Sequence, residues 1–228
     1  HKYYPKLVVA VPFTPATGPR LLLGEHSTEA RQVLAAAAIQ VAKESSISSV
    51  HWLFPQDDEV DALGDLGLLV RWGQQFHWKN PGFRDFQDYL DAMTHKKRKQ
   101  IRHERRDAHA SPVEVEVLVG HEIQEYQWEA YHALYASTYD RKWGYPSLTT
   151  GFFKEVGETM PDSTMLVLGK RAGHYVAGAH LFLGQHALYG RNWGCTEFHR
   201  GLHFEMCYYR PIQYCIEHGI GGFEAGAG

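Results

Sequence analysis

The spacing of apolar residues changes several times along the chain, and each pattern predicts one kind of element. Residues 113–119 alternate apolar with acidic side chains for most of their length, which is the two-residue period of a half-buried strand. Apolar runs at 165–170, 175–183 and 186–193, separated by short polar turns, predict a β-meander. A helix is predicted over 202–218. This order of strands and helices predicts a mixed α/β fold.

The first part of the chain predicts a separate set of elements. Strands are expected at 6–11, 48–54 and 68–76, and helices at 30–43 and 57–63. A loop rich in proline, threonine and glycine follows the first strand and breaks regular structure there.

A basic helix is predicted between these two sets of elements. Thr94 is its expected N-cap, and Pro112 closes the segment. We therefore expect residues 1–94 to form the C-terminal part of a first domain, 95–111 a basic inter-domain helix, and 112–228 a second domain.

Charge is distributed unevenly along the 228 residues. The total is −3, but residues 96–106 hold seven Lys or Arg against one Glu, so this segment is +6 and the remainder is −9. The chain as a whole is therefore not a general polyanion-binding protein, yet it carries one concentrated basic segment.

Several function classes are disfavoured by composition. No run approaches the roughly 18 apolar residues that span a bilayer, so we expect a cytoplasmic protein. Three cysteines without a CxxC pair favour buried thiols over a disulfide or zinc framework. His199 and His203 share a helical spacing but lack a third ligand, so no metal is expected. Because the chain opens at His1 without a methionine, we interpret it as a piece of a longer protein.

The end of the third meander strand predicts an anion site. A strand that leads through a small-residue turn into a helix directs unpaired backbone N–H groups at one point, where phosphate binds. The turn residues predicted to bind a donor are Phe198, His199, Arg200, Gly201, Leu202 and His203. Within this set, Arg200 supplies a fixed charge and Gly201 permits close approach. The alternative is an ordinary strand–helix turn with a solvated arginine.

Several segments together resemble the FemAB-like family, which belongs to the GNAT superfamily of N-acyltransferases. The resemblance covers most of the chain. It is carried by Pro5–Leu7 and Val11–Arg20, by Thr94–Arg102, by Tyr139–Pro146 with Leu148–Thr149, by Leu202–Glu205 with Tyr208–Tyr209, by Pro211–Gly219, and by the end at Phe223–Ala227.

This resemblance implies tandem GNAT-like domains, the first incomplete and the second truncated at its C-terminus. It implies transfer of an acyl or aminoacyl group to an amine acceptor, which is small or peptide-like and related to peptidoglycan peptides. The donor is acyl-CoA or, as the alternative, aminoacyl-tRNA. A non-catalytic module that recognises peptidoglycan peptide or RNA is the rival hypothesis.

Acyl transfer needs a base for the attacking ammonium and an acid for the leaving group. Glu197 and Glu205 are candidate bases, although Glu205 also suits a helix start. Tyr189 and Tyr209 are candidate acids, with core packing as the alternative. The residues predicted to contact the acceptor are Arg141, Lys142, Trp143, Arg191 and Trp193. For Arg191, a salt bridge within the sheet is an equal alternative.

The basic segment has two possible roles. Its cations occupy every face of the predicted helix, and Ile101 is the only apolar residue among them, so it is expected to anchor the helix. A solvated linking helix is the simpler interpretation. The functional one is contact of Lys97, Arg98 and Arg102 with the phosphates of an aminoacyl-tRNA.

Overall fold

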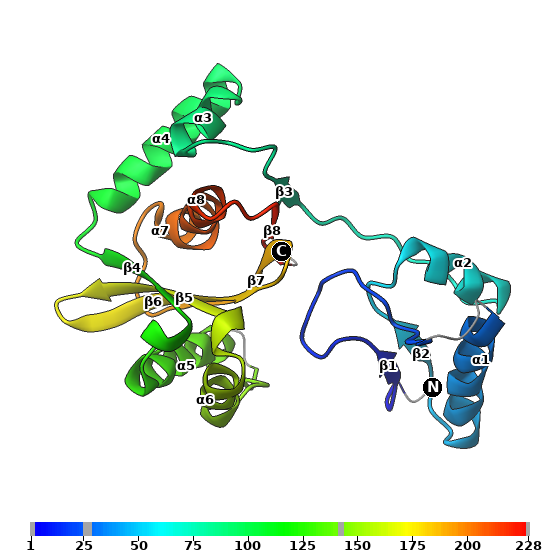
Figure 1. Ribbon diagram of the computed structural model, residues 1–228. Helices are drawn as coiled ribbons and strands as arrows, with labels where there is room; N and C mark the ends of the chain where they lie inside the picture. The colour runs from blue at the N-terminus through cyan, green and yellow to red at the C-terminus, as the bar shows by residue number, and fades with distance from the viewer. Residues whose placement is uncertain (1–2, 25–28, 141–143, 227–228) are drawn as a thin grey trace. The chain divides into compact units, whose positions relative to one another are not determined.

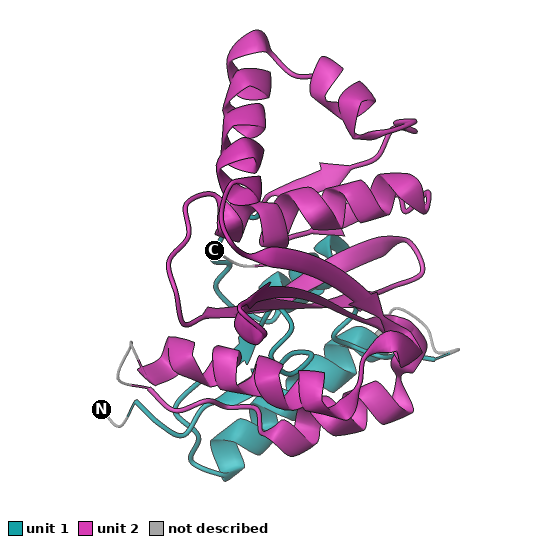
Figure 2. Cartoon of the chain, turned by 90° about the vertical axis from the view of Figure 1, so that its left-hand side faces the viewer, with its two compact units in different colours: residues 1–75, 227–228 teal, residues 76–226 magenta. Residues whose placement is uncertain are grey.

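The computed structural model describes residues 3–24, 29–140 and 144–226. It separates into two compact units, with unit 1 ending at Gln75 and unit 2 running from Phe76 to Gly226 (Figure 2). The sequence predicted this boundary near residue 94 and placed the basic helix between domains. In the structure that helix belongs to unit 2, because it packs on the C-terminal helices of the same unit.

Unit 1 is small and contains a two-stranded parallel sheet. Strand β1 (Leu7–Val9) pairs with β2 (Val50–Trp52), and the helices are α1 (Glu29–Glu44) and α2 (Asp57–Asp65). The carboxylate of Glu59 is buried and accepts hydrogen bonds from the backbone N–H groups of Arg20 and Leu21 at 2.7 and 2.6 Å. These bonds tie the segment before α1 to the start of α2.

The prediction of a strand at 68–76 is wrong. Residues 68–76 form no strand, and Leu69 and Trp72 are exposed. Regular pairing begins only at β3 (His77–Lys79), where β8 supplies a partner. A strand-like sequence without a neighbouring strand cannot satisfy its backbone groups in a ladder.

Unit 2 is built on a six-stranded mixed sheet of order β3-β8-β7-β6-β5-β4 (Figure 1). Its remaining strands are β4 (Glu114–Val119), β5 (Thr164–Arg171), β6 (His174–Leu183), β7 (Ala187–Cys195) and β8 (Gly222–Glu224). Neighbouring strands are antiparallel except β7 and β8, which are parallel. The mixed α/β class and the β-meander predicted from sequence are confirmed.

Helices cover both faces of this sheet. Helices α5 (Glu125–Asp140) and α6 (Thr150–Thr159) lie on one face. On the other lie α7 (Leu202–Phe204), the π-helical turn η3 (Glu205–Tyr209) and α8 (Arg210–Glu217), with α3 (Phe86–Asp91) and α4 (His95–His109) beyond them. Two short 3-10 turns, η1 (Gly120–Glu122) and η2 (Pro161–Ser163), complete the unit. Among the described residues, no helix is long and apolar enough to cross a membrane.

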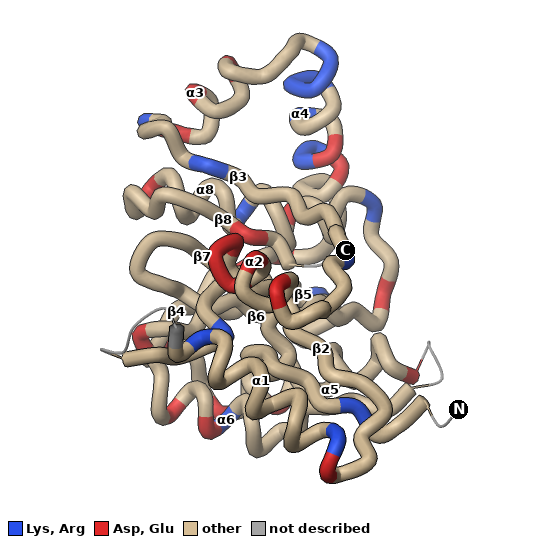
Figure 3. The backbone as a smooth tube through the Cα atoms, turned by 90° about the vertical axis from the view of Figure 1, so that its right-hand side faces the viewer, with Lys and Arg blue, Asp and Glu red and all other residues tan. Residues whose placement is uncertain are grey.

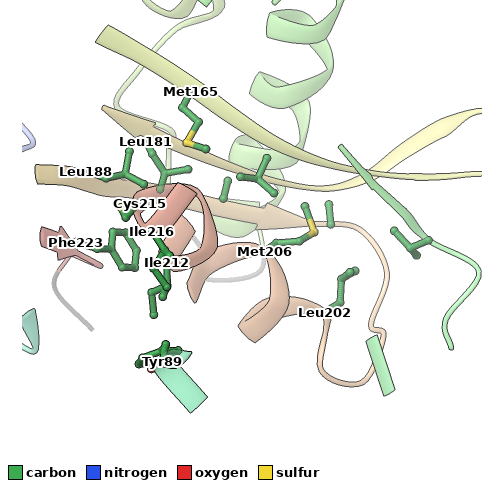
Figure 4. Packing of buried hydrophobic residues seen from close by; sticks show 14 of the residues in the cluster. Tyr89, Met165, Leu181, Leu188, Leu202, Met206, Ile212, Cys215, Ile216 and Phe223 are labelled. Atoms are coloured by element: carbon green, nitrogen blue, oxygen red, sulfur yellow. The ribbon is translucent and has the colours of Figure 1, made fainter. Parts of the chain in front are cut away.

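The main core lies between the sheet and α8. Ile212, Cys215 and Ile216 of α8 form one buried cluster with Leu188 of β7 and Phe223 of β8, and Met206 joins it from η3 (Figure 4). A second cluster on the opposite face joins aromatic side chains of α5 and α6 to β5. Both faces of the central strands are therefore buried, as their continuous apolar sequence predicts.

Two local features of the helices follow from single residues. Thr94 caps α4, since its hydroxyl accepts a hydrogen bond from the backbone N–H of Lys97 at 3.4 Å, and Ile101 is buried beneath the helix. Both predictions are confirmed. The helix predicted at 202–218 is interrupted by η3 because Pro211 has no backbone N–H and its ring excludes a regular turn before it.

Candidate functional site

Glu205 is the centre of a buried ionic network. Its carboxylate is 0% exposed and accepts hydrogen bonds from Arg105 at 3.0 and 3.1 Å and from His109 at 3.0 Å. Arg210 makes an ion pair with the same carboxylate at 3.0 Å. These contacts join α4 to the turn η3 and compensate the buried negative charge. A role as base, which the sequence predicts for Glu205, would require this network to open.

Tyr209 belongs to the same contact between helices. Its hydroxyl donates a hydrogen bond to Glu104 of α4, and its ring lies 6.3 Å from that of Phe86. Burial, together with the hydrogen bond to Glu104, raises the pKa of Tyr209 well above its ordinary value. The phenol is thus held protonated, and its proton is already engaged within the protein.

The turn predicted to bind a donor is covered by α4. Gly201 has a φ of 76°, and a Cβ atom there would collide with the carbonyl oxygen of Glu104. The guanidinium of Arg200 lies 3.0 Å from the carboxylate of Asp107. The N–H of Leu202 donates to the carbonyl of His199 at 3.2 Å. A phosphate at this turn would have to displace these contacts.

Glu197, the other predicted base, is also paired. Arg171 donates two hydrogen bonds to its carboxylate, at 2.7 and 2.5 Å, and His199 lies 2.9 Å from it. The hydrogen bond from Arg171, and then the one from His199, lowers the pKa of Glu197 to about 2. A carboxylate with so low a pKa is a weak base at neutral pH.

Tyr189 lies in a different setting, in a row of polar side chains across three strands. It pairs with Glu224 in the parallel β7–β8 ladder, and Glu224 pairs with His77 in the β8–β3 ladder. Cross-strand partners project from the same face of a sheet. The Glu224 carboxylate lies 3.4 Å from Nδ1 of His77. Burial, and then the charge of Glu224, raises the pKa of Tyr189.

This row projects from the face of the sheet on which α5 lies. Tyr189 pairs with Phe182 of β6, and the ring of Phe182 contacts that of His180 at 4.6 Å. The ring of His180 in turn lies against Trp128 and Tyr131 of α5. The row therefore lies opposite the core between the sheet and α8.

Arg191 follows Tyr189 on β7, at a β-bulge. Leu181 pairs with Gly190 and His180 with Asn192, so Arg191 is the additional residue. Burial is the main cause that lowers the pKa of His180, and the charge of Arg191 adds to it, which places the guanidinium near this face. Arg191 is half-buried, and no hydrogen bond or ion pair joins it to another described residue. The salt bridge within the sheet, the alternative weighed for it, is therefore absent from the described part of the chain.

The cations of α4 are sorted by face. Its carboxylates, Glu104 and Asp107, point inward and bond to Tyr209 and Arg200. Helix α4 lines two shallow depressions of about 680 and 620 Å³, the second together with α3, and Figure 3 marks the basic residues along this helix. The two depressions are lined by His95, Lys96, Arg98, Lys99, Gln100, Arg102, His103 and Arg106, and by Phe86, Leu90, Arg102, Arg105, Arg106, His109 and Ala110. Neither lining contains a carboxylate.

The three cations predicted to contact phosphate differ in their exposure and in their bonds to other side chains. Lys97 is exposed and Arg102 is exposed with a hydrogen bond to Gln87 at 3.1 Å, whereas Arg98 is bound to Asp91 at 3.1 Å. Arg105 points inward to Glu205, which agrees with the prediction that the cations cover every face of the helix and cannot all serve one surface.

The family is decided by comparison of the whole chain. The FemAB-like family model, described as peptidoglycan biosynthesis or recognition, matches residues 1–228. This chain belongs to the FemAB-like family. The resemblance predicted from its motifs is thereby confirmed. No curated protein matches the chain.

Solved structures share the fold of this FemAB-like chain at low sequence identity. L-PGS from Bacillus licheniformis has a TM-score of 0.60 at 12% identity, covering 86% of this chain and 57% of that one. The C-terminal domain of a putative lysylphosphatidylglycerol synthetase from Agrobacterium fabrum has a TM-score of 0.59 at 12% identity. The match covers 86% of this chain and 59% of that one. FemX has a TM-score of 0.57 at 14% identity, and the match covers 96% of this chain and 74% of that one. This FemAB-like chain thus spans less than two thirds of the first two structures, and the likeness shows the fold.

Other predicted site residues of this family member are dispersed. Arg141, Lys142 and Trp143 lie outside the described residues. Trp193 is half-buried on the core face of β7, with its ring 5.1 Å from that of His203. The polar row contains Tyr189 and adds two residues that sequence analysis missed, His77 and Glu224. Only the strand pairing reveals these two, because they lie at opposite ends of unit 2 in sequence.

Proposed function

We propose that this chain acts in the transfer of an aminoacyl group from aminoacyl-tRNA to an amine acceptor of peptide-like chemistry. Membership of a peptidoglycan-related family supports the reaction class. The guanidinium of Arg191, which is bonded to none of the described residues, supports an acceptor that carries a carboxylate, since such a pair forms two parallel hydrogen bonds. A tRNA donor places the reaction in the cytoplasm.

The outer face of α4 carries the donor assignment. The helix has 15 residues and is therefore about 22 Å long, enough to follow several phosphates of a nucleic acid. Five of its seven lysines and arginines are exposed, while both of its carboxylates, like Arg105, are bonded on the inner side. Such sorting suits a polyanion better than a solvated linking helix, which has no need to segregate its charges.

Acyl-CoA is the alternative donor. It also carries phosphates, and the sequence predicts the turn at 198–203 as its site. The contacts of Arg200 and Gly201 with α4 give that turn less support, because a CoA phosphate would compete with Asp107 and with the backbone of Glu104. The two donors are separated directly by experiment.

The test combines turnover with binding. Labelled aminoacyl-tRNA and acyl-CoA are offered with a lysine-containing peptide acceptor, and amide product is measured. Product from aminoacyl-tRNA supports the proposal, whereas product from acyl-CoA alone refutes aminoacyl-tRNA as the donor. If neither donor gives product, the proposal that this chain catalyses transfer is contradicted. Binding of tRNA or peptide that is still measured would then identify a recognition module.

Charge variants test the surface. Lys96→Ala with Lys99→Ala should weaken tRNA binding and reduce the slope of log affinity against log salt by about two, because each lysine that neutralises a phosphate contributes about one. The matched control is Lys6→Ala with Lys43→Ala, which removes the same charge from unit 1. An equal fall in affinity in both double variants would show a general charge effect and exclude α4 as the site.

A further inference from the structure

The second of the two depressions, here called the α3–α4 depression, lies where these two helices run side by side (Figure 1). Arg98 of α4 bonds to Asp91 of α3 at 3.1 Å, and Arg102 of α4 donates a hydrogen bond to Gln87 of α3 at 3.1 Å. The depression has a volume of about 620 Å³, within the range of about 300–1,000 Å³ that small-molecule sites occupy. It is therefore large enough to receive a group the size of a nucleotide.

The lining of the α3–α4 depression combines an apolar wall with cations. Helix α3 contributes Phe86 and Leu90, and α4 contributes arginines and His109. The guanidinium carbon of Arg105 lies 4.3 Å from the centre of the Phe86 ring, in a cation–π contact. By contrast, the first depression is lined only by histidine, lysine, arginine and glutamine side chains. The two depressions therefore suit different parts of a ligand.

Arg105 is held in place from below this wall. Its guanidinium donates hydrogen bonds to both oxygens of Glu205, at 3.0 and 3.1 Å, and to Gln213 at 2.9 Å. The hydrogen bonds of a guanidinium lie in its plane, so a group that stacks on its face leaves them intact. The side chain keeps 17% of its surface exposed. A planar ligand can thus contact Arg105 without opening the network around Glu205.

Arg102 and Arg106 supply charge that the protein does not neutralise. Both are exposed, and both line the two depressions. Neither forms an ion pair with a carboxylate in the described part of the chain, since Arg102 bonds to the neutral Gln87 and Arg106 to a histidine of its own helix. The single negative charge of Glu205 is already shared among two arginines and a histidine. The α3–α4 depression therefore carries a surplus of positive charge.

A ligand that fits this lining has a planar apolar face and negative charge beside it. An unpaired nucleotide has both, because its base is free to stack and its phosphates are charged, whereas the bases of a duplex are already stacked inside the double helix. We infer that the α3–α4 depression binds an unpaired nucleotide of the tRNA donor, with its base against Phe86 and Arg105. The flanking phosphates then lie on Arg102 and Arg106. This inference rests on the proposed function and names the part of the donor that α3 and α4 recognise, which is a single-stranded segment.

The first experiment measures binding by fluorescence anisotropy with two RNA hairpins that have the same stem and the same short 3′ overhang. The overhang of one hairpin carries its bases and that of the other is abasic, so both probes have the same phosphates. The wild type should bind the first hairpin about fivefold or more tightly than the second, because stacking of one base on an aromatic side chain contributes on this scale. Equal binding of the two hairpins, or no binding of either, overturns the inference.

The variant Phe86→Leu should remove this difference, because leucine keeps an apolar side chain in the core and lacks the aromatic ring. Affinity for the hairpin with bases should fall to that for the abasic hairpin, which should itself stay unchanged. The matched control is Phe83→Leu. Phe83 is likewise half-buried and contacts the ring of Tyr89 at 5.5 Å, compared with 5.3 Å for Phe86, but it does not line the depression. An equal loss in both variants, or no loss in Phe86→Leu, overturns the inference.

A second variant tests the phosphate contact on the surface and stays informative if Phe86→Leu does not fold. Arg106→Gln should weaken binding of both hairpins alike and reduce the slope of log affinity against log salt by about one, whereas Phe86→Leu should leave the slope unchanged. The matched control is Arg84→Gln, which removes an exposed arginine that is paired with Asp88 at 3.2 Å. An unchanged affinity and slope in Arg106→Gln, or the same change in the control, overturns the inference.

The transfer assay decides the proposed function separately. Amide product from aminoacyl-tRNA together with equal binding of the two hairpins overturns this inference alone. Base-dependent binding that is lost in Phe86→Leu, without amide product from either donor, supports the nucleotide site and overturns the proposed transfer.

Discussion

His180 should make the stability of unit 2 depend on pH. Its imidazole is 1% exposed and lies against the rings of Trp128, Tyr131 and Phe153, and its Nε2 has no hydrogen-bond partner among the described residues. Burial, and then the positive charge of Arg191, lowers the pKa of His180 from 6.5 to about 3. The folded protein therefore keeps this histidine neutral over a range in which the unfolded chain protonates it.

The sign and size follow from linkage. Between pH 6.5 and pH 3 the unfolded state binds one proton more at this position, so the free energy of unfolding falls as the pH falls. Each pH unit in this window is worth about 1.4 kcal/mol. At pH 5 the loss is therefore about 2 kcal/mol relative to neutral pH, which lowers the melting temperature of a unit of this size by roughly 4–8 °C.

The measurement compares wild type with His180→Phe. Phenylalanine keeps a planar ring in the aromatic cluster and removes the titrating group. Urea unfolding at pH 7.5 and pH 5.0 gives two free energies for each protein, and the difference between the proteins cancels the titration of the other histidines. We expect the wild type to lose about 2 kcal/mol more than the variant. An identical loss in both proteins would refute the assignment of a neutral, buried His180.

Two further predictions concern the contact of α4 with the C-terminal helices, and both are measured by chemical denaturation. Glu205→Gln should destabilise unit 2 by about 3–5 kcal/mol, because Arg105, His109 and Arg210 lose their counter-charge; its control, Glu125→Gln on an exposed ion pair, should stay within about 0.5 kcal/mol. Gly201→Ala should cost more than Gly219→Ala: both have positive φ, but only Gly201 would drive a Cβ into the backbone of α4. Equal effects within either pair would contradict these contacts.

Sequence patterns predicted most of unit 2 because its strands carry strong local signals. The alternation at 113–119 and the apolar runs that follow correspond to β4, β5, β6 and β7. The prediction of a strand at 68–76 failed because a strand needs a partner, and that information is not local. The prediction of an uninterrupted helix at 202–218 failed before Pro211, where a π-helical turn replaces the regular α-helical hydrogen bonds.

Site residues were harder to predict than the fold. Glu197 and Glu205 have the expected chemistry, but sequence does not show that arginines 26 and 100 residues away fill their carboxylates. Arg200 was expected to meet a phosphate and meets Asp107. His77 and Glu224 carried no motif, and β8 consists of only three residues. Their proximity is created by the pairing of the first and last strands of unit 2, which no local pattern encodes.

The position of the polar row of Tyr189, Glu224 and His77 follows from the same register that builds the core. Leu188 pairs with Phe223, and both belong to the buried cluster beneath α8. The next pair along the ladder, Tyr189 with Glu224, must therefore project from the opposite face, because side chains alternate along a strand. A slip of one residue would bury Glu224 in the core and expose Phe223, at a cost that hydrophobic packing prevents. The apolar residues of β7 and β8 thus fix the polar row as firmly as they fix the core.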